Sequence, residues 1–204
     1  MVDNINLLIY NSNTIRMKWR KTMEKNSNTY QIAAVGVMAA VTCILGPLAI
    51  PIGLVPISFT NLAIYFGIYT LGMKKGTLSY IIYMLIGLFG VPVFSHFTAG
   101  PSKILGPTGG YLIGFIFMAL IAGFFIDKFF SRWYLCLAGM VLGTVVCYAF
   151  GTVWLSYQAK MSLSTALVAG VIPFIPGDLI KIIIAAYTGP KIRKQLIKAK
   201  LFHA

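Results

Sequence analysis

Six long apolar stretches, in which charged residues are almost absent, constrain the fold of this chain more than any other feature. Of the 204 residues, 58% are hydrophobic and 10% are charged, whereas soluble domains are about 25% charged. A helix needs about 20 apolar residues to cross a bilayer core. The stretches cover residues 30–50, 58–73, 76–92, 109–126, 133–157 and 163–188. The sequence therefore predicts an all-α, polytopic membrane protein with six transmembrane helices.

The distribution of Lys and Arg predicts how these helices are oriented. If both termini are cytoplasmic, the inner side receives 14 of the 17 cations, the outer side receives Lys103 and Lys160, and Lys181 lies within the membrane. Cytoplasmic loops carry an excess of Lys and Arg, so both termini are expected in the cytoplasm. The net charge of +13 then belongs to loops beside the lipid bilayer and not to a surface that binds nucleic acid.

Composition also divides the chain into three parts. Residues 1–29 are polar and basic, which predicts an N-terminal tail or an interfacial helix. Residues 30–190 contain the apolar stretches and form the predicted transmembrane domain, and residues 191–204 form a basic, cytoplasmic C-terminal tail. Asp127, next to Lys128, is interpreted as a solvated boundary at the cytoplasmic end of the fourth stretch.

A carboxylate and an ammonium lie three residues apart inside the last apolar stretch, at Asp178 and Lys181. Each costs roughly 2.5–3.5 kcal/mol at the centre of a membrane helix, and this spacing places both on one helix face. Pro173, Pro176 and Gly177 predict a break in the helix just before them. Such broken helices often form substrate sites; the alternative is an ion pair that only fastens the helix to its neighbours.

Two connections on the predicted outer side also lead towards Asp178. Residues 46–56 are uncharged and contain three prolines, so they cannot form a regular helix; they suit either a lid over a cavity or a re-entrant plug. Residues 91–107 lead into the fourth stretch through Thr108, Gly109 and Gly110. We expect both connections to face the side of the membrane on which Asp178 lies.

Five segments occur in order between residues 30 and 190: VPISF at 55–59, LGMKKG at 71–76, GVPVF at 90–94, GPTGGYLIGF at 106–115 and PFIPGDLIK at 173–181. Together they resemble the BioY family, the biotin-binding S component of energy-coupling factor (ECF) transporters. The resemblance implies that residues 30–190 are a six-helix substrate-binding domain. It also implies capture of biotin on the outer side of a bacterial plasma membrane.

The resemblance further implies partners in place of catalytic activity. A transmembrane coupling (T) subunit and two ATP-hydrolysing subunits would supply the energy, so the chain itself needs no cofactor. The sequence has no G-x-x-x-x-G-K-[ST] phosphate loop and, within its apolar stretches, no His/Cys metal set or carboxylate pair. Another function that the residues leave open is a self-sufficient, ion-coupled secondary transporter, in which Asp178 binds a proton or a sodium ion.

If biotin is the ligand, as the resemblance implies, the chemistry of its two ends matches different residues. Its ureido ring carries two N–H donors, and an ionised Asp178 only accepts hydrogen bonds. Lys181 would keep Asp178 ionised and donate either to the ureido carbonyl or to the ligand carboxylate. The carboxylate is expected near the backbone N–H groups of Thr108, Gly109 and Gly110 at a helix N-terminus. The alternative for these glycines is a tight turn that lets helices pack closely.

Four more polar or aromatic residues are candidate contacts. Tyr111, Trp154 and Tyr157 would supply apolar walls with polar tips, although Trp154 and Tyr157 fit an interfacial aromatic belt equally well. Asn61 is polar among apolar residues and is a further candidate.

The first apolar stretch carries a candidate surface for a partner. S components of this group tend to contact the coupling subunit through an Ala-x-x-x-Ala pair, and the nearest equivalent here is Gly36-x-x-x-Ala40. Small residues at this spacing let helices approach closely. The pair therefore serves either packing within the chain or docking of the T subunit.

Overall fold

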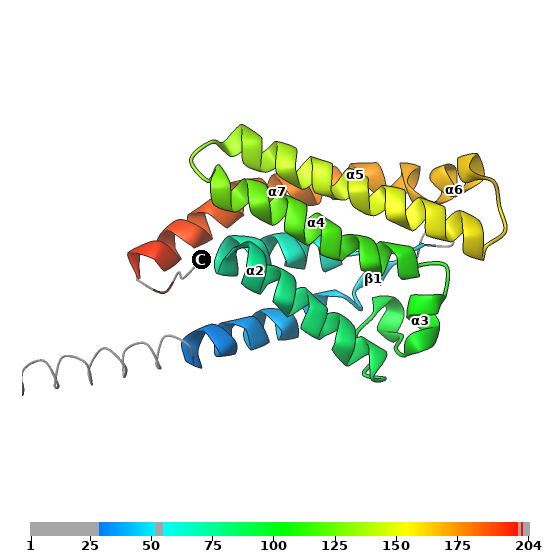
Figure 1. Ribbon diagram of the computed structural model, residues 1–204, viewed down its shortest axis with the longest axis horizontal. Coiled ribbons are helices and arrows are strands. Elements are labelled where there is room, and N and C mark those ends of the chain that lie inside the picture. Colours follow the sequence, from blue (N-terminus) through cyan, green and yellow to red (C-terminus); the bar gives the residue numbers. More distant parts are fainter. Residues whose placement is uncertain (1–28, 52–54, 200, 202–204) are drawn as a thin grey trace, which may run out of the picture. The chain divides into compact units, whose positions relative to one another are not determined.

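The computed structural model describes residues 29–51, 55–199 and 201 (Figure 1). Contacts between residues divide the chain into two units, Met1–Ala34 and Val35–Ala204. In the first unit, residues 29–34 are helical. The predicted N-terminal tail or interfacial helix, residues 1–29, lies outside the described residues except for Thr29.

The second unit is built mainly from helices that pack side by side (Figure 1). A first helix, Thr29–Leu45, leads into it. The remaining elements are β1 (Ala49–Ile50), β2 (Ile57–Ser58), α2 (Thr60–Leu88), η1 (Ser95–Phe97), α3 (Pro101–Leu105), α4 (Gly109–Lys128), α5 (Trp133–Gln158), α6 (Leu163–Gly170), η2 (Ile172–Phe174) and α7 (Ile175–Lys198).

Three of these segments, α4, α5 and the combined α6–α7 region Leu163–Lys198, are long and apolar enough to cross a membrane. The all-α membrane class is thereby confirmed. The one departure is β1 and β2, two-residue strands that pair antiparallel, with Ala49 opposite Ser58 and Ile50 opposite Ile57. The prolines of residues 46–56 exclude a helix there, and the first helix ends at Leu45 instead of the expected residue 50.

α2 reverses direction at Gly72. This residue has φ 79° and ψ 175°, a conformation that L-residues with a side chain rarely adopt. The two halves of α2 then lie against each other, because a Cβ built on Gly76 would approach the backbone of Ile68 to 2.9 Å. The second and third apolar stretches are therefore joined by a reversal at one residue, without a separate loop.

The predicted break before Asp178 is confirmed. α6 ends at Gly170, Val171 leaves helical geometry with φ −130°, and η2 separates it from α7. α7 begins at Ile175 and holds Asp178 in its first turn. The helix then continues to Lys198, so the expected boundary of a C-terminal tail at residue 191 does not interrupt it.

Tyrosine hydroxyls link the helices inside the core. Three of them are hydrogen-bonded to an oxygen on another helix, which satisfies a polar group that lipid could not. The pairs join α2 to α5, α2 to α4, and α4 to α6: Tyr65–Thr144 (2.7 Å), Tyr80–Leu112 O (2.8 Å) and Tyr111–Gly170 O (2.8 Å).

Asp127 is not the solvated boundary that its position suggested. Its Oδ1 accepts a hydrogen bond from Arg193 Nη1 at 2.8 Å, and its Oδ2 accepts one from the Met73 amide at 2.7 Å. Arg193 is 5% exposed, and its guanidinium lies 4.7 Å from the centre of the Phe130 ring. Asp127 therefore ties α4 to α7 and to the start of the second half of α2.

Replacing Arg193 with Met should destabilise the protein, because Asp127 would lose its buried cation. Removal of one partner from a buried ion pair costs about 3–5 kcal/mol, and the exposed fraction of the Asp127 side chain, 29%, places the expected loss near the lower figure. Thermal unfolding in detergent measures it. The double variant Asp127→Asn/Arg193→Met should recover part of the loss.

Lys128→Met is the matched control, since it removes an exposed cation next to Asp127 and should leave unfolding nearly unchanged. An equal loss in Arg193→Met and Lys128→Met would contradict the structural role of the Asp127–Arg193 pair.

Candidate functional site

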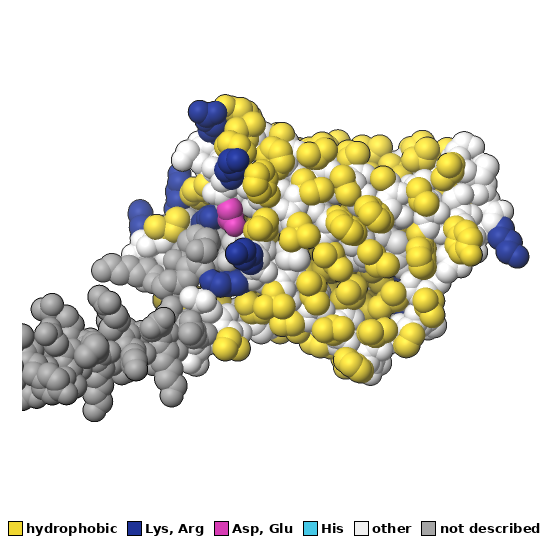
Figure 2. Space-filling model, viewed as in Figure 1, with side chains coloured by type: hydrophobic (Ala, Val, Ile, Leu, Met, Phe, Trp, Pro, Cys, Tyr) yellow, Lys and Arg dark blue, Asp and Glu magenta, His cyan; other side chains and the backbone are white. Residues whose placement is uncertain are grey.

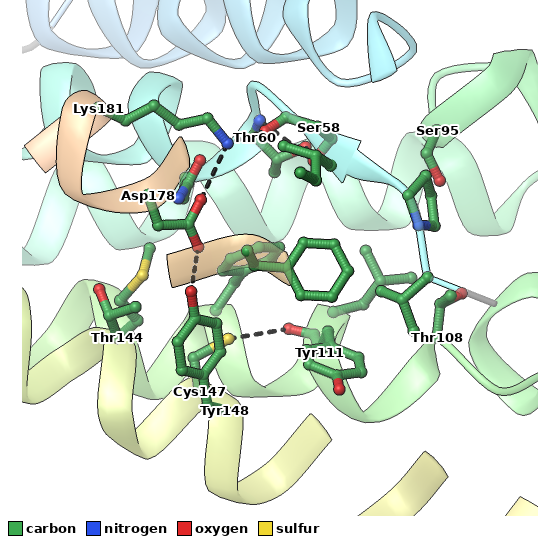
Figure 3. Close-up of a pocket in the computed structure, with 18 of the residues that line it drawn as sticks. Ser58, Thr60, Ser95, Thr108, Tyr111, Thr144, Cys147, Tyr148, Asp178 and Lys181 are labelled. Carbon is green, nitrogen blue, oxygen red and sulfur yellow. Dashed lines mark hydrogen bonds and ion pairs between the residues drawn. The ribbon is translucent and has the colours of Figure 1, made fainter. Parts of the chain in front are cut away.

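A cavity lies where α2, α4, α5 and α7 meet the two predicted outer connections (Figure 3). It contains about 690 Å³ of space not filled by atoms, part of it open to solvent. Pro56 and Ser95, one from each connection, line it together with Asp178. The expectation that both connections face the side of Asp178 is therefore confirmed.

Asp178 and Lys181 form the centre of a hydrogen-bonded network at one wall of this cavity (Figure 3). Lys181 Nζ lies 3.0 Å from Asp178 Oδ1 and donates to the Ser58 carbonyl at 2.6 Å. The Tyr148 hydroxyl donates to Asp178 Oδ2 at 2.6 Å. The side chains of Lys181 and Asp178 are only 7% and 13% exposed. The network joins α5, α7 and β2.

Asp178 keeps the capacity to accept further hydrogen bonds. A carboxylate oxygen has two lone pairs, and each oxygen of Asp178 has one protein donor. The position of Asp178 in the first turn of α7 also favours its negative charge, through the helix dipole. In the part of the chain that the structure describes, no three His, Cys, Asp or Glu side chains come together as a metal site would need.

Apolar side chains form the walls of the cavity beyond this network. Tyr111, Phe115 and Phe174 line it, and aromatic residues suit the apolar part of a small ligand. Asn61 lines it too and is 3% exposed. The Asn61 Oδ1 accepts a hydrogen bond from the Leu62 amide at 3.0 Å, so the side-chain NH₂ is the group that it can offer to a ligand.

A second cation, Lys103 of α3, lines the same cavity. Burial lowers the pKa of Lys103 below its ordinary value, because leaving water disfavours the charged form. None of the ion pairs among the described residues includes Lys103. An anionic group of a ligand would therefore find an uncompensated positive charge here.

Four of the nine candidate contacts lie outside the residues that line the cavity. Gly109 donates its amide to Gly106 O at 3.0 Å, and a Cβ on Gly110 would lie 2.2 Å from the Trp154 Cβ. Trp154 Nε1 donates to the same Gly106 carbonyl at 2.8 Å. Gly109 and Gly110 thus allow a tight turn and close helix packing, which was the alternative to an anion site. Tyr157 is 79% exposed.

Sequence reasoning missed three groups of the site. Tyr148 stands in an apolar helix with Thr144 one turn before it and Thr152 one turn after, a polar stripe that could have drawn attention to it. Lys103 was counted only as an outer-side charge. The carbonyl of Ser58 leaves no trace in a sequence, because every residue has one.

Gly36 and Ala40 are exposed on the first helix. A Cβ built on Gly36 would meet no atom within 4 Å. Among the residues that the structure describes, close packing within the chain, one of the two alternatives for this pair, therefore does not involve Gly36.

Comparison with known proteins agrees with this architecture. The BioY family matches residues 20–198. "Biotin transporter BioY" from Thermotoga maritima is 36% identical over 165 residues, 80% of this chain and 96% of that protein. The protein of the same name from Lactococcus lactis subsp. cremoris is 35% identical, covering 85% and 95% of the two chains.

A solved structure is similar as well. The crystal structure of "the S-component for biotin from an ECF-type ABC transporter" matches with a TM-score of 0.77 and 34% identity, over 83% of this chain and 93% of that one. These relatives are transport proteins of the membrane and not enzymes. The family match covers most of the sequence, and the chain belongs to the BioY family.

Proposed function

We propose that this chain captures biotin as the S component of an ECF-type ABC transporter. The names of its relatives support this function. The observation that carries it is one cavity with a paired carboxylate, Asp178, at one wall and a half-buried cation, Lys103, among its other lining residues. Biotin has the matching groups, namely two ureido N–H donors at one end and a carboxylate at the other.

In this proposal Asp178 binds the ureido ring. The remaining lone pairs of its carboxylate accept the ureido N–H groups, while Tyr148 and Lys181 hold the carboxylate in place. Lys181 has used two of its three N–H donors, on Asp178 and on the Ser58 carbonyl. Its third donor or the Asn61 side-chain NH₂ reaches the ureido carbonyl.

The ligand carboxylate then lies towards the segment that joins α3 to α4. Lys103 and Thr108 line the cavity there and offer an ammonium and a hydroxyl, in place of the glycine amides expected from the sequence. The rings of Tyr111 and Phe174 enclose the thiophane.

The arrangement in the membrane and the partners belong to the same proposal. Six helices cross a bacterial plasma membrane with both termini in the cytoplasm; the reversal of α2 at Gly72 and the charge distribution support this topology. The exposed Gly36 and Ala40 provide the surface for a transmembrane T subunit. Two ATPase subunits supply the energy.

Substitution of Asp178 tests the site directly. Asp178→Asn replaces an acceptor with an amide whose NH₂ opposes the ureido donors, and Lys181→Ala leaves Asp178 without its cation. Loss of one partner from a buried charged pair costs about 2–5 kcal/mol, so each variant should bind biotin about thirtyfold more weakly or worse. Calorimetric titration of the purified, folded protein measures this.

Tyr157→Ala is the control for these variants, since Tyr157 is exposed and the variant should keep the wild-type affinity. Unchanged affinity in both Asp178→Asn and Lys181→Ala would contradict the assignment of the binding site. Failure of the wild-type chain to bind biotin would contradict the assignment of biotin as the ligand.

The pH dependence of binding tests the role of Lys103. Its pKa is lowered by burial, so the ammonium is lost at a lower pH than in an ordinary lysine, as the pH rises through that lowered pKa. Biotin affinity should therefore fall as the pH rises, and it should do so before an ordinary lysine would lose its charge. Lys103→Arg should move this fall to higher pH, because arginine stays charged, and Lys103→Met should bind weakly throughout. An identical pH profile for Lys103→Met and the wild type would contradict this role.

A further inference from the structure

Three lysines form a ridge on the last turns of α7. Lys191, Lys194 and Lys198 follow each other at helical spacings of three and four, which places them on one face of the helix, and all three are exposed. Arg193 lies on the opposite face, where it is buried against Asp127. This lysine ridge therefore stands on a helix end that is held in place from behind.

The described part of the chain offers these lysines no carboxylate. The whole sequence has four acidic residues, and the two that the structure describes pair elsewhere, Asp127 with Arg193 and Asp178 with Lys181. No ion pair of the lysine ridge occurs within residues 29–51, 55–199 and 201. Any anion that pairs with these lysines must therefore come from outside this part of the chain.

The surroundings of the lysine ridge are those of a membrane interface. Lys191 Nζ lies 3.5 Å from the centre of the Tyr187 ring, which is 67% exposed. Ile192 and Ile197 are 38% and 48% exposed beside the lysines. Aromatic rings next to cations are typical of the headgroup level, and exposed apolar side chains at the same level suit contact with acyl chains.

Length places the lysine ridge at the same depth. α7 itself, Ile175–Lys198, has 24 residues, or about 36 Å of helix at 1.5 Å per residue, against a hydrocarbon core of about 30 Å. One end of α7 therefore extends beyond the core, and the end that carries the three exposed lysines suits the headgroup layer. Figure 2 shows Lys and Arg side chains gathered at this end of the molecule, next to its apolar surface.

The lysines also border a shallow hollow. This hollow contains about 780 Å³ of space that is open to solvent, and it is lined by Lys191, Lys194, Gln195, Ile197 and Lys198. The phosphate group of a phospholipid in this hollow would be within reach of several ammonium groups. The acyl chains of the same lipid would extend along the exposed isoleucines.

We propose that the lysine ridge binds the phosphate of anionic phospholipids in the leaflet around the C-terminal end of α7. An acidic protein surface would match the charge but not the exposed isoleucines and tyrosine at headgroup depth. The lipid binds the ridge from one side while the Asp127–Arg193 pair holds α7 from the other.

The test uses the full chain in neutral detergent, with phosphatidylglycerol or phosphatidylcholine added in steps and bound lipid counted by native mass spectrometry. Phosphatidylglycerol should bind preferentially, and inorganic phosphate should not displace it. The variant Lys191→Gln/Lys194→Gln/Lys198→Gln should bind phosphatidylglycerol on the order of a hundredfold more weakly, since each basic residue near anionic lipid contributes about one kilocalorie per mole. The corresponding triple Lys→Arg variant should keep the affinity.

The matched control removes three cations from other elements: Lys74→Gln/Lys128→Gln/Arg132→Gln. It should lose less than about tenfold in affinity, because its cations do not share the lysine ridge. Equal losses in the two glutamine variants, or equal binding of the two lipids by the wild type, would overturn the proposal. Asp178 is 13 residues, or about 20 Å of helix, from Lys191, so biotin binding should be the same in all variants. A failure of the proposed biotin function can therefore be distinguished from a failure of the proposed lipid site.

Discussion

The ion pair between Asp178 and Lys181 is the interaction on which the site depends. Two charges placed in a membrane protein are costly, and apolar side chains of similar volume would often be more stable. The cost is offset because Asp178 also accepts from Tyr148 and Lys181 also donates to the Ser58 carbonyl. The pair thereby determines where α5, α7 and β2 meet.

A second ion pair holds the other end of α7. Arg193 follows Lys181 by 12 residues, about 18 Å along the helix, and binds Asp127 of α4. Between helices in lipid there is little hydrophobic driving force, so polar links and close packing decide how they align. With Lys181 joined to β2 and Arg193 joined to α4, α7 is held at both ends, and the position of Asp178 at the cavity wall follows from this.

Hydropathy predicted α4 and α5 closely, because backbone groups in lipid must pair within helices. Pro173, Pro176 and Gly177 predicted the break before α7, which only a cavity or neighbouring protein can satisfy. Hydropathy could not show that the chain reverses at Gly72 alone, since one positive φ changes no hydropathy. Asp127 was misjudged because its partner Met73 lies 54 residues away in the sequence. Tyr148 was missed because its partner Asp178 lies 30 residues away. Nothing local in the sequence records the bond from Trp154 to the Gly106 carbonyl either.

The charges of the cavity add a constraint on its ligand. Among the lining residues, one is acidic, Asp178, and two are basic, Lys181 and Lys103, so the cavity has one basic side chain more than it has carboxylates. A ligand with a single negative charge makes the occupied cavity neutral, whereas a neutral analogue leaves Lys103 half-buried without a counter-ion, at a cost in desolvation. In the proposed biotin site, the same residues would favour biotin over its uncharged amide through Lys103, while Asp178 would distinguish the ureido ring from rings without N–H donors.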